Sequence, residues 1–174
     1  FMTYAQIATG FKSCGANPRP FFPAQALTHD PETLTAYELG FKSDLFDRLL
    51  RLNVSGFFNK YNDILVSVST CPTVPAAPCA LPLNAGEADV KGFEVEATLR
   101  PVRGLLIDAS LGYLDFDYKS ISPLASSAGV TLDMDAPFVQ EWRWSVGGQY
   151  EIDLGDAGSL TPRVDVNSQS PYFS

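Results

Sequence analysis

The chain has 174 residues, enough for one domain with a sizeable core, and 45% of them are aliphatic or aromatic. No window approaches the roughly 20 consecutive apolar residues of a membrane-spanning helix, so a helical membrane protein is excluded. The net charge of −8 argues against nucleic acid as a partner, because phosphate binding draws on clustered Lys and Arg. The mean hydropathy near zero is compatible with a membrane β-barrel, in which polar and apolar residues alternate.

Alternation of apolar and polar residues recurs from end to end, whereas helical periodicity is hard to find. We expect seven strands, at residues 2–12, 34–46, 50–66, 88–100, 105–117, 142–154 and 160–169. Ordinary globular strands have about five or six residues, and most of these exceed the roughly 9–11 residues of a tilted bilayer-crossing strand. The predicted fold class is all-β, an antiparallel up-and-down meander of about seven long strands.

The connections between these strands are of two kinds, and the two kinds alternate. Short turns are expected at 47–48, 101–104 and 155–158, and long loops at 13–33, 67–87 and 118–141. In a meander every second connection lies at the same end, so one end carries short turns and the other carries long loops. Outer-membrane barrels show this asymmetry, whereas the crossings of a Greek-key sandwich mix both kinds at each end.

Each strand has one charge-free face. Phe93, Val95 and Ala97 share one face of the fourth strand, opposite Glu94 and Glu96. A lipid-facing surface predicts this pattern, but so does the buried face of a soluble sheet. Lipid is favoured by the long strands, the sorted loops and the aromatic residues near strand ends, namely Phe46, Tyr113, Trp142 and Trp144.

Three stretches then resemble a known family. "YAQIATGFKSCGANPRP" (4–20) is a barrel strand that runs into a Gly/Asn/Pro loop, and "PETLTAYELGFKSDLFDRLLRLNVSGFFNKYNDI" (31–64) is a hairpin with the pattern P-E-x-x-x-x-Y-E-x-G-x-K. "NAGEADVKGFEVEATLRPVRGLLIDASLGYLDFDY" (84–118) is a further hairpin. These stretches resemble the β-barrel of TonB-dependent outer-membrane receptors.

The resemblance implies an active importer in the bacterial outer membrane, with the segment forming part of a 22-stranded, monomeric barrel. The plug domain, coupling box and closing strands of that family are absent from residues 1–174, which we therefore expect to be an internal part of the barrel domain. The implied partners are membrane lipid, the TonB–ExbB–ExbD complex acting through the plug, and a scarce ligand, foremost an iron–siderophore complex. A passive porin-like or structural barrel and a soluble β adhesion domain are the alternatives.

No enzyme signature is found, and we expect no catalytic residue and no cofactor. The single histidine, His29, lies in a loop without a nucleophile motif nearby. Cys71 and Cys79 flank a proline-rich stretch and are either unrelated thiols or a loop-closing disulfide, with Cys14 left over.

Two further sets of loop residues have competing interpretations. Arg19, Phe21 and Phe22 in the first long loop either contact an anionic, often aromatic, ligand or pack the loop onto the barrel rim. Four aspartates border the third long loop and are either a calcium site or solvated acids: Asp115, Asp117, Asp133 and Asp135.

Overall fold

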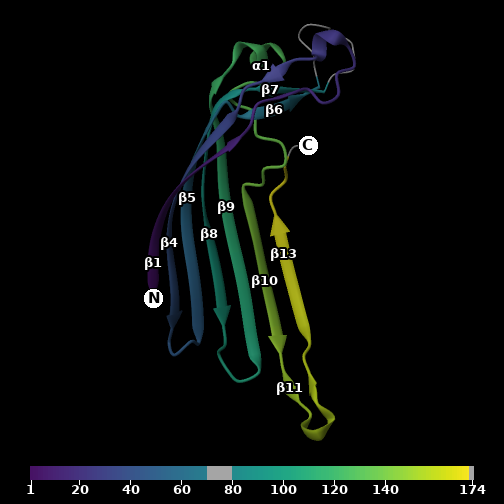
Figure 1. Cartoon of the computed structure of the whole chain (residues 1–174). Helices are drawn as coiled ribbons and strands as arrows, with labels where there is room; N and C mark the ends of the chain where they lie inside the picture. Colours follow the sequence, from purple (N-terminus) through teal and green to yellow (C-terminus); the bar gives the residue numbers. More distant parts are fainter. Residues whose placement is uncertain (70–79, 173–174) are drawn as a thin grey trace.

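The computed structural model describes residues 1–69 and 80–172 and is built around one antiparallel sheet (Figure 1). Seven strands form it, in the order β1-β4-β5-β8-β9-β10-β13. Their bounds are β1 Met2–Lys12, β4 Glu32–Leu45, β5 Leu50–Asn62, β8 Gly86–Leu99, β9 Leu105–Ile121, β10 Trp142–Tyr150 and β13 Arg163–Gln169. Each strand pairs with its neighbours in this order, so the predicted meander is confirmed.

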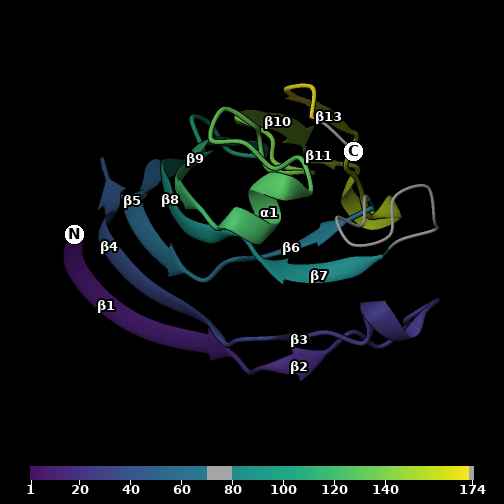
Figure 2. The same ribbon diagram turned by 90° about the horizontal axis from the view of Figure 1, so that it is seen from above.

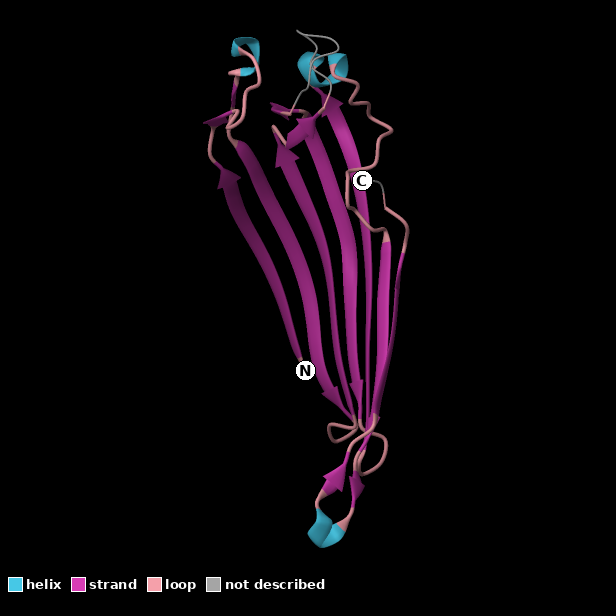
Figure 3. Cartoon of the chain, turned by 90° about the vertical axis from the view of Figure 1, so that its right-hand side faces the viewer, coloured by secondary structure: helices cyan, strands magenta, loops and turns pink. Residues whose placement is uncertain are grey.

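The two ends of the sheet differ as the turn chemistry predicts. Turns β4–β5 and β8–β9 lie at one end, together with the small hairpin of β11 (Ile152–Asp153), η2 (Gly155–Ala157) and β12 (Ser159–Leu160) (Figures 1 and 3). The β4–β5 turn holds Phe46, Asp47 and Arg48 at positive φ, the left-handed conformation that tight turns require. We call this the short-turn end.

The long connections gather at the opposite end, which we call the mouth (Figure 1). The first holds β2 (Gly15–Ala16), η1 (Pro23–Gln25) and β3 (Thr28–His29), the second holds β6 (Leu65–Val68) and β7 (Leu81–Asn84), and the third holds α1 (Pro123–Ser127). Viewed from above, the sheet is curved, and β6, β7 and α1 lie on its concave side (Figure 2). Within the described residues, no helix is long and apolar enough to cross a membrane.

The register gives the sheet one apolar and one polar face. Val54, Val95, Leu111 and Trp144 share the convex, apolar face, since each is paired with the next across adjacent strands. Large side chains on this face are solvent-exposed in the isolated chain, for example Ile7 at 72%, Leu39 at 67% and Val164 at 70%. A continuous exposed apolar surface of this kind marks contact with lipid or a partner rather than with water.

The polarity of the two faces reverses toward the mouth. In β9 the apolar face runs from Leu105 to Tyr113, eight residue steps, or about 26 Å along the strand and about 20 Å along the membrane normal at the usual tilt. Phe93, Tyr113 and Trp142 close this band as an aromatic row, with ring centroids 4.6–6.0 Å apart. Such a row is typical of a membrane–water interface.

Beyond the aromatic row, the convex face becomes charged and the concave face becomes apolar. Lys91 pairs with Asp115 at 3.0 Å on the convex side, while Ala88 and Tyr118 are buried on the concave side. Side chains beneath the mouth therefore pack against the loops, and those facing outward meet water or lipid head groups.

Four expected strands need correction, and the bounds of two others, 34–46 and 88–100, shift by one or two residues. The strand predicted at 142–154 ends at Tyr150, and Ile152–Asp153 form the separate β11. The strand predicted at 50–66 ends at Asn62, because Asp63 adopts a φ of 55°, and the chain turns inward as β6. The strand predicted at 105–117 continues to Ile121 because apolar residues of the mouth loops pack against its end. The strand predicted at 160–169 begins at Arg163, so Pro162 precedes β13. The carbonyl of Pro162 accepts a hydrogen bond from Tyr150 N–H.

Candidate functional site

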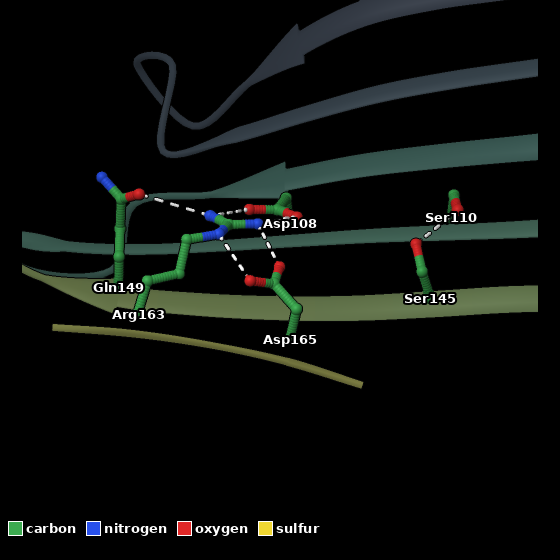
Figure 4. A network of polar contacts seen from close by, with 6 residues as sticks. All are labelled: Asp108, Ser110, Ser145, Gln149, Arg163 and Asp165. Carbon is green, nitrogen blue, oxygen red and sulfur yellow. Dashed lines mark hydrogen bonds and ion pairs between the residues drawn. The ribbon is translucent and has the colours of Figure 1, made fainter. Parts of the chain in front are cut away.

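The concave wall carries ion pairs that cross a whole strand (Figure 4). Arg163 of β13 reaches over β10 to Asp108 of β9, with its two terminal nitrogens 2.8 and 3.0 Å from the two carboxylate oxygens. It also contacts Asp165 of its own strand and Gln149 of β10. Gly147 of β10 lies beneath the guanidinium, and a Cβ there would collide with Arg163, Asp165 and Asp108.

A second crossing follows the same plan one strand away. Arg143 of β10 donates to Glu94 of β8 at 2.6 Å, and its side chain covers Gly112 of β9, where a Cβ would lie 2.9 Å from Nε. Both arginines thus lie flat on the wall because a glycine occupies the intervening strand. The concave wall is therefore polar and flat, and each of these ion pairs links two strands that have one strand between them.

The second and third long loops form one body at the mouth. Eight residues make an apolar cluster that joins β6, β7, the tops of β8 and β9, and α1 with the loop after it: Val68, Leu81, Leu83, Ala85, Ala88, Tyr118, Ala125 and Val130. Alternation along β9 places Phe116 and Tyr118 on the concave side, where their rings meet edge to face at 4.8 Å and pack with this cluster. Burial raises the pKa of Tyr118 above the ordinary value of a tyrosine.

Asn84 links all three long loops. Its side-chain oxygen accepts from Asp30 N–H at 2.8 Å, and its amide nitrogen donates to the carbonyls of Asp30 and Asp63 at 3.1 and 2.9 Å. Its own carbonyl accepts from the Ser122 hydroxyl at 2.7 Å, and that hydroxyl also caps α1. One residue at the end of β7 therefore fixes the first loop against the other two.

The first loop is organised from inside by polar residues. Gln25 is fully buried and accepts from Phe21 N–H at 2.8 Å, while Asn17 donates to the Gln25 carbonyl at 3.0 Å. Phe21 and Phe22 are exposed, as is Arg19. The three predicted ligand-binding residues therefore lie together on the outside of this loop, and their role in binding stays a prediction.

The four aspartates of the calcium interpretation do not come together in the described structure, although Asp115 and Asp135 line one pocket beside β9. Asp115 and Asp117 are on the convex face, where Lys91 and Lys119 pair with them. Asp133 lies in the loop after α1, and a hydrogen bond from the Thr131 side chain holds its pKa below the usual range. No group of three or more His, Cys, Asp or Glu suited to a metal occurs among residues 1–69 and 80–172.

The predicted Cys71–Cys79 disulfide lies outside the described residues. Cys14 is exposed and free in the described structure. It lies between β1 and β2, at the start of the first long loop.

Residues 1–173 match the family described as TonB dependent receptor-like, beta-barrel. The chain belongs to the TonB-dependent receptor β-barrel family. The resemblance seen in the sequence is confirmed over nearly the whole chain, and with it the position in the bacterial outer membrane, where these receptors occur.

Solved receptor structures contain the same sheet. The ferric yersiniabactin uptake receptor FyuA from Yersinia pestis matches 98% of this chain at 25% identity and a TM-score of 0.71. The ferric preacinetobactin receptor BauA from Acinetobacter baumannii and the alcaligin receptor FauA from Bordetella pertussis each match 97% at 19% identity, with TM-scores of 0.65 and 0.57. This chain covers 23–26% of these three proteins.

Several residues that organise this TonB-dependent receptor segment escape prediction from the sequence. Asn84 looks like an ordinary loop residue, and its three partners are known only from the folded loops. Gly112 and Gly147 do carry a signal, because a glycine inside a strand often marks a close approach of another group. The sequence does not show that the approaching groups are Arg143 and Arg163.

Proposed function

We propose that this chain forms part of the barrel wall and external mouth of an active receptor that imports an iron–siderophore complex across the outer membrane. The observation that carries the proposal is the match of 98% of the chain, at 25% identity, to a receptor for ferric yersiniabactin. The remaining strands and the plug would come from parts of the receptor outside residues 1–174. The family has 22-stranded barrels, and we propose the same monomeric barrel here.

The two ends of the sheet support the proposal. The convex apolar face and its aromatic row suit a lipid bilayer, which argues against a soluble adhesion domain. The mouth holds loops packed into a fixed body with exposed Arg19, Phe21 and Phe22 beside it. A cation with aromatic surface suits an anionic chelate.

The energy for import would come from the TonB–ExbB–ExbD complex acting on the plug. The concave wall is consistent with this, since Arg143 and Arg163 lie flat on it and pair with carboxylates of the same wall. A passive porin-like barrel is the competing proposal, and it predicts uptake without an energised inner membrane.

The ligand class can be tested by growth under iron limitation. The full-length receptor would be expressed in a bacterium that lacks its own ferric-chelate receptors, and ferric catecholates, phenolates, hydroxamates and carboxylates would be supplied one at a time. We expect one chelate class to restore growth. If none does, while a vitamin or a saccharide is taken up through the receptor, the siderophore assignment is wrong.

A further inference from the structure

The mouth contains a pocket of about 180 Å³ between β6 and the loop that follows α1. Most of its lining is apolar, formed by Val66, Val68, Ala128, Val130, Met134 and Pro137. An apolar cavity of about 150 Å³ is large enough to take benzene. The pocket therefore has room for a single six-membered ring.

The polar groups of this pocket are few. Tyr118, Asp135 and two serines line it. Tyr118 is only 6% exposed, and among the described residues no hydrogen bond to its hydroxyl is found. The hydroxyl is still reached by solvent, since among the described residues only Ser43 Oγ is a buried side-chain polar atom without a partner. It is therefore available to a ligand group. A ring hydroxyl could accept from Tyr118 and donate to the Asp135 carboxylate.

The walls of the pocket are fixed before any ligand arrives. Val68, Tyr118 and Val130 belong to the apolar cluster that joins the second and third loops, and Asn84 ties those loops to the first. A preformed site loses less conformational entropy on binding than a loop that must fold around its ligand.

We infer that this pocket binds one flat, hydroxyl-bearing ring of the imported ligand, held by Tyr118 and Asp135. The inference rests on the proposed function only in assigning the ring to a transported molecule. Ring binding itself is measured without transport.

The test uses the full-length receptor in lipid nanodiscs, with 4-fluorophenol as the probe and binding followed by fluorine NMR. Met134→Trp places a bulky side chain in the pocket, and Leu132→Trp is the matched control. Both positions are surface-exposed, at 48% and 54%, but only Met134 lines the pocket. Empty nanodiscs correct for partition of the probe into lipid.

We expect saturable binding of 4-fluorophenol to the wild type and to Leu132→Trp, and at least tenfold weaker binding to Met134→Trp. Tyr118→Phe should reduce the preference for 4-fluorophenol over fluorobenzene several-fold. Absence of saturable binding, or equal binding by Met134→Trp and the wild type, would overturn the inference. If 4-fluorophenol binds as expected but no ferric chelate supports growth, the pocket stands and the proposed function fails.

Discussion

Arg163 of β13 and Asp108 of β9 are joined by two hydrogen bonds of 2.8 and 3.0 Å across the strand between them. This contact needs Gly147, whose missing side chain leaves room for the guanidinium. The pair ties the last described strand of the sheet to a strand two places away, in addition to the backbone ladder.

We predict different effects on stability for alanine at two adjacent glycines. Gly148→Ala should raise stability by about 0.5–1 kcal/mol, because glycine costs that much in a strand and no atom lies within 4 Å of its Cβ position. Gly147→Ala should leave stability about unchanged, because its Cβ displaces Arg163 from a half-exposed ion pair. That ion pair is worth up to about 1 kcal/mol, which offsets the gain from replacing glycine. Thermal unfolding of the two full-length variants measures the difference, and equal stabilisation by both would show that the crossing contributes nothing.

Asn84 should control the first loop. Asn84→Ala removes the acceptor of Asp30 N–H, and we expect exchange of that amide to accelerate about five- to 150-fold, the equivalent of 1–3 kcal/mol. Asn84→Asp keeps an acceptor for Asp30 N–H but loses the two donated bonds, so it should protect Asp30 better than alanine does. Hydrogen exchange with residue-level resolution separates the variants. Unchanged exchange in Asn84→Ala would mean that other contacts hold the loop.

The two faces of β8 should respond differently to the same charge. Val95→Arg places a cation in the middle of the apolar face, and we expect a loss of about 2–4 kcal/mol in folding free energy in a bilayer. Glu96→Arg, one residue on, points to the concave wall near Glu94 and should be tolerated. The yield of folded receptor in the outer membrane measures the effect of each variant. A comparable loss of yield for both variants would contradict the assignment of the lipid-facing side.

Arg19 should strengthen the binding of an anionic ferric chelate. Arg19→Ala removes a charge from the mouth, and a charge-assisted contact of about 1.5 kcal/mol corresponds to roughly tenfold weaker binding. The control is Arg103→Ala, the same change at an exposed position of the short-turn end. Titration of each variant with the chelate, followed by tryptophan fluorescence, measures its affinity for the chelate. Equal affinities would favour the other interpretation, in which this loop only packs on the rim.

Much of the fold follows from short-range patterns. Alternation such as that along 93–99 predicts the strands and their faces. Turn residues such as those at 47–48 predict which end of the sheet carries the short connections. The reversal of polarity after Tyr113 was not predicted. Alternation along β9 places Phe116 and Tyr118 on the concave side, and large apolar residues are accommodated there because β6, β7 and α1 cover them. Nothing in 105–121 reveals what those distant segments will do.

The candidate site was harder to predict for the same reason. Asp115 and Asp117 are close in sequence, as metal ligands often are, yet Asp115 pairs with Lys91 across the sheet and Asp117 pairs with Lys119 of its own strand. Tyr118 and Asn84 gain their significance from partners in other loops. Arg19, Phe21 and Phe22 form a cluster that is recognisable from the sequence because its members are close together in the chain, and their role in ligand binding stays a prediction.

Active import is tested most directly by accumulation of radioactive iron inside cells that carry the full-length receptor and receive the chelate that restores growth. We predict uptake far above that of cells without the receptor. When a protonophore removes the proton-motive force, uptake should collapse while chelate binding to the cell surface persists. Uptake that continues undiminished after the protonophore would contradict an active receptor and support a passive barrel.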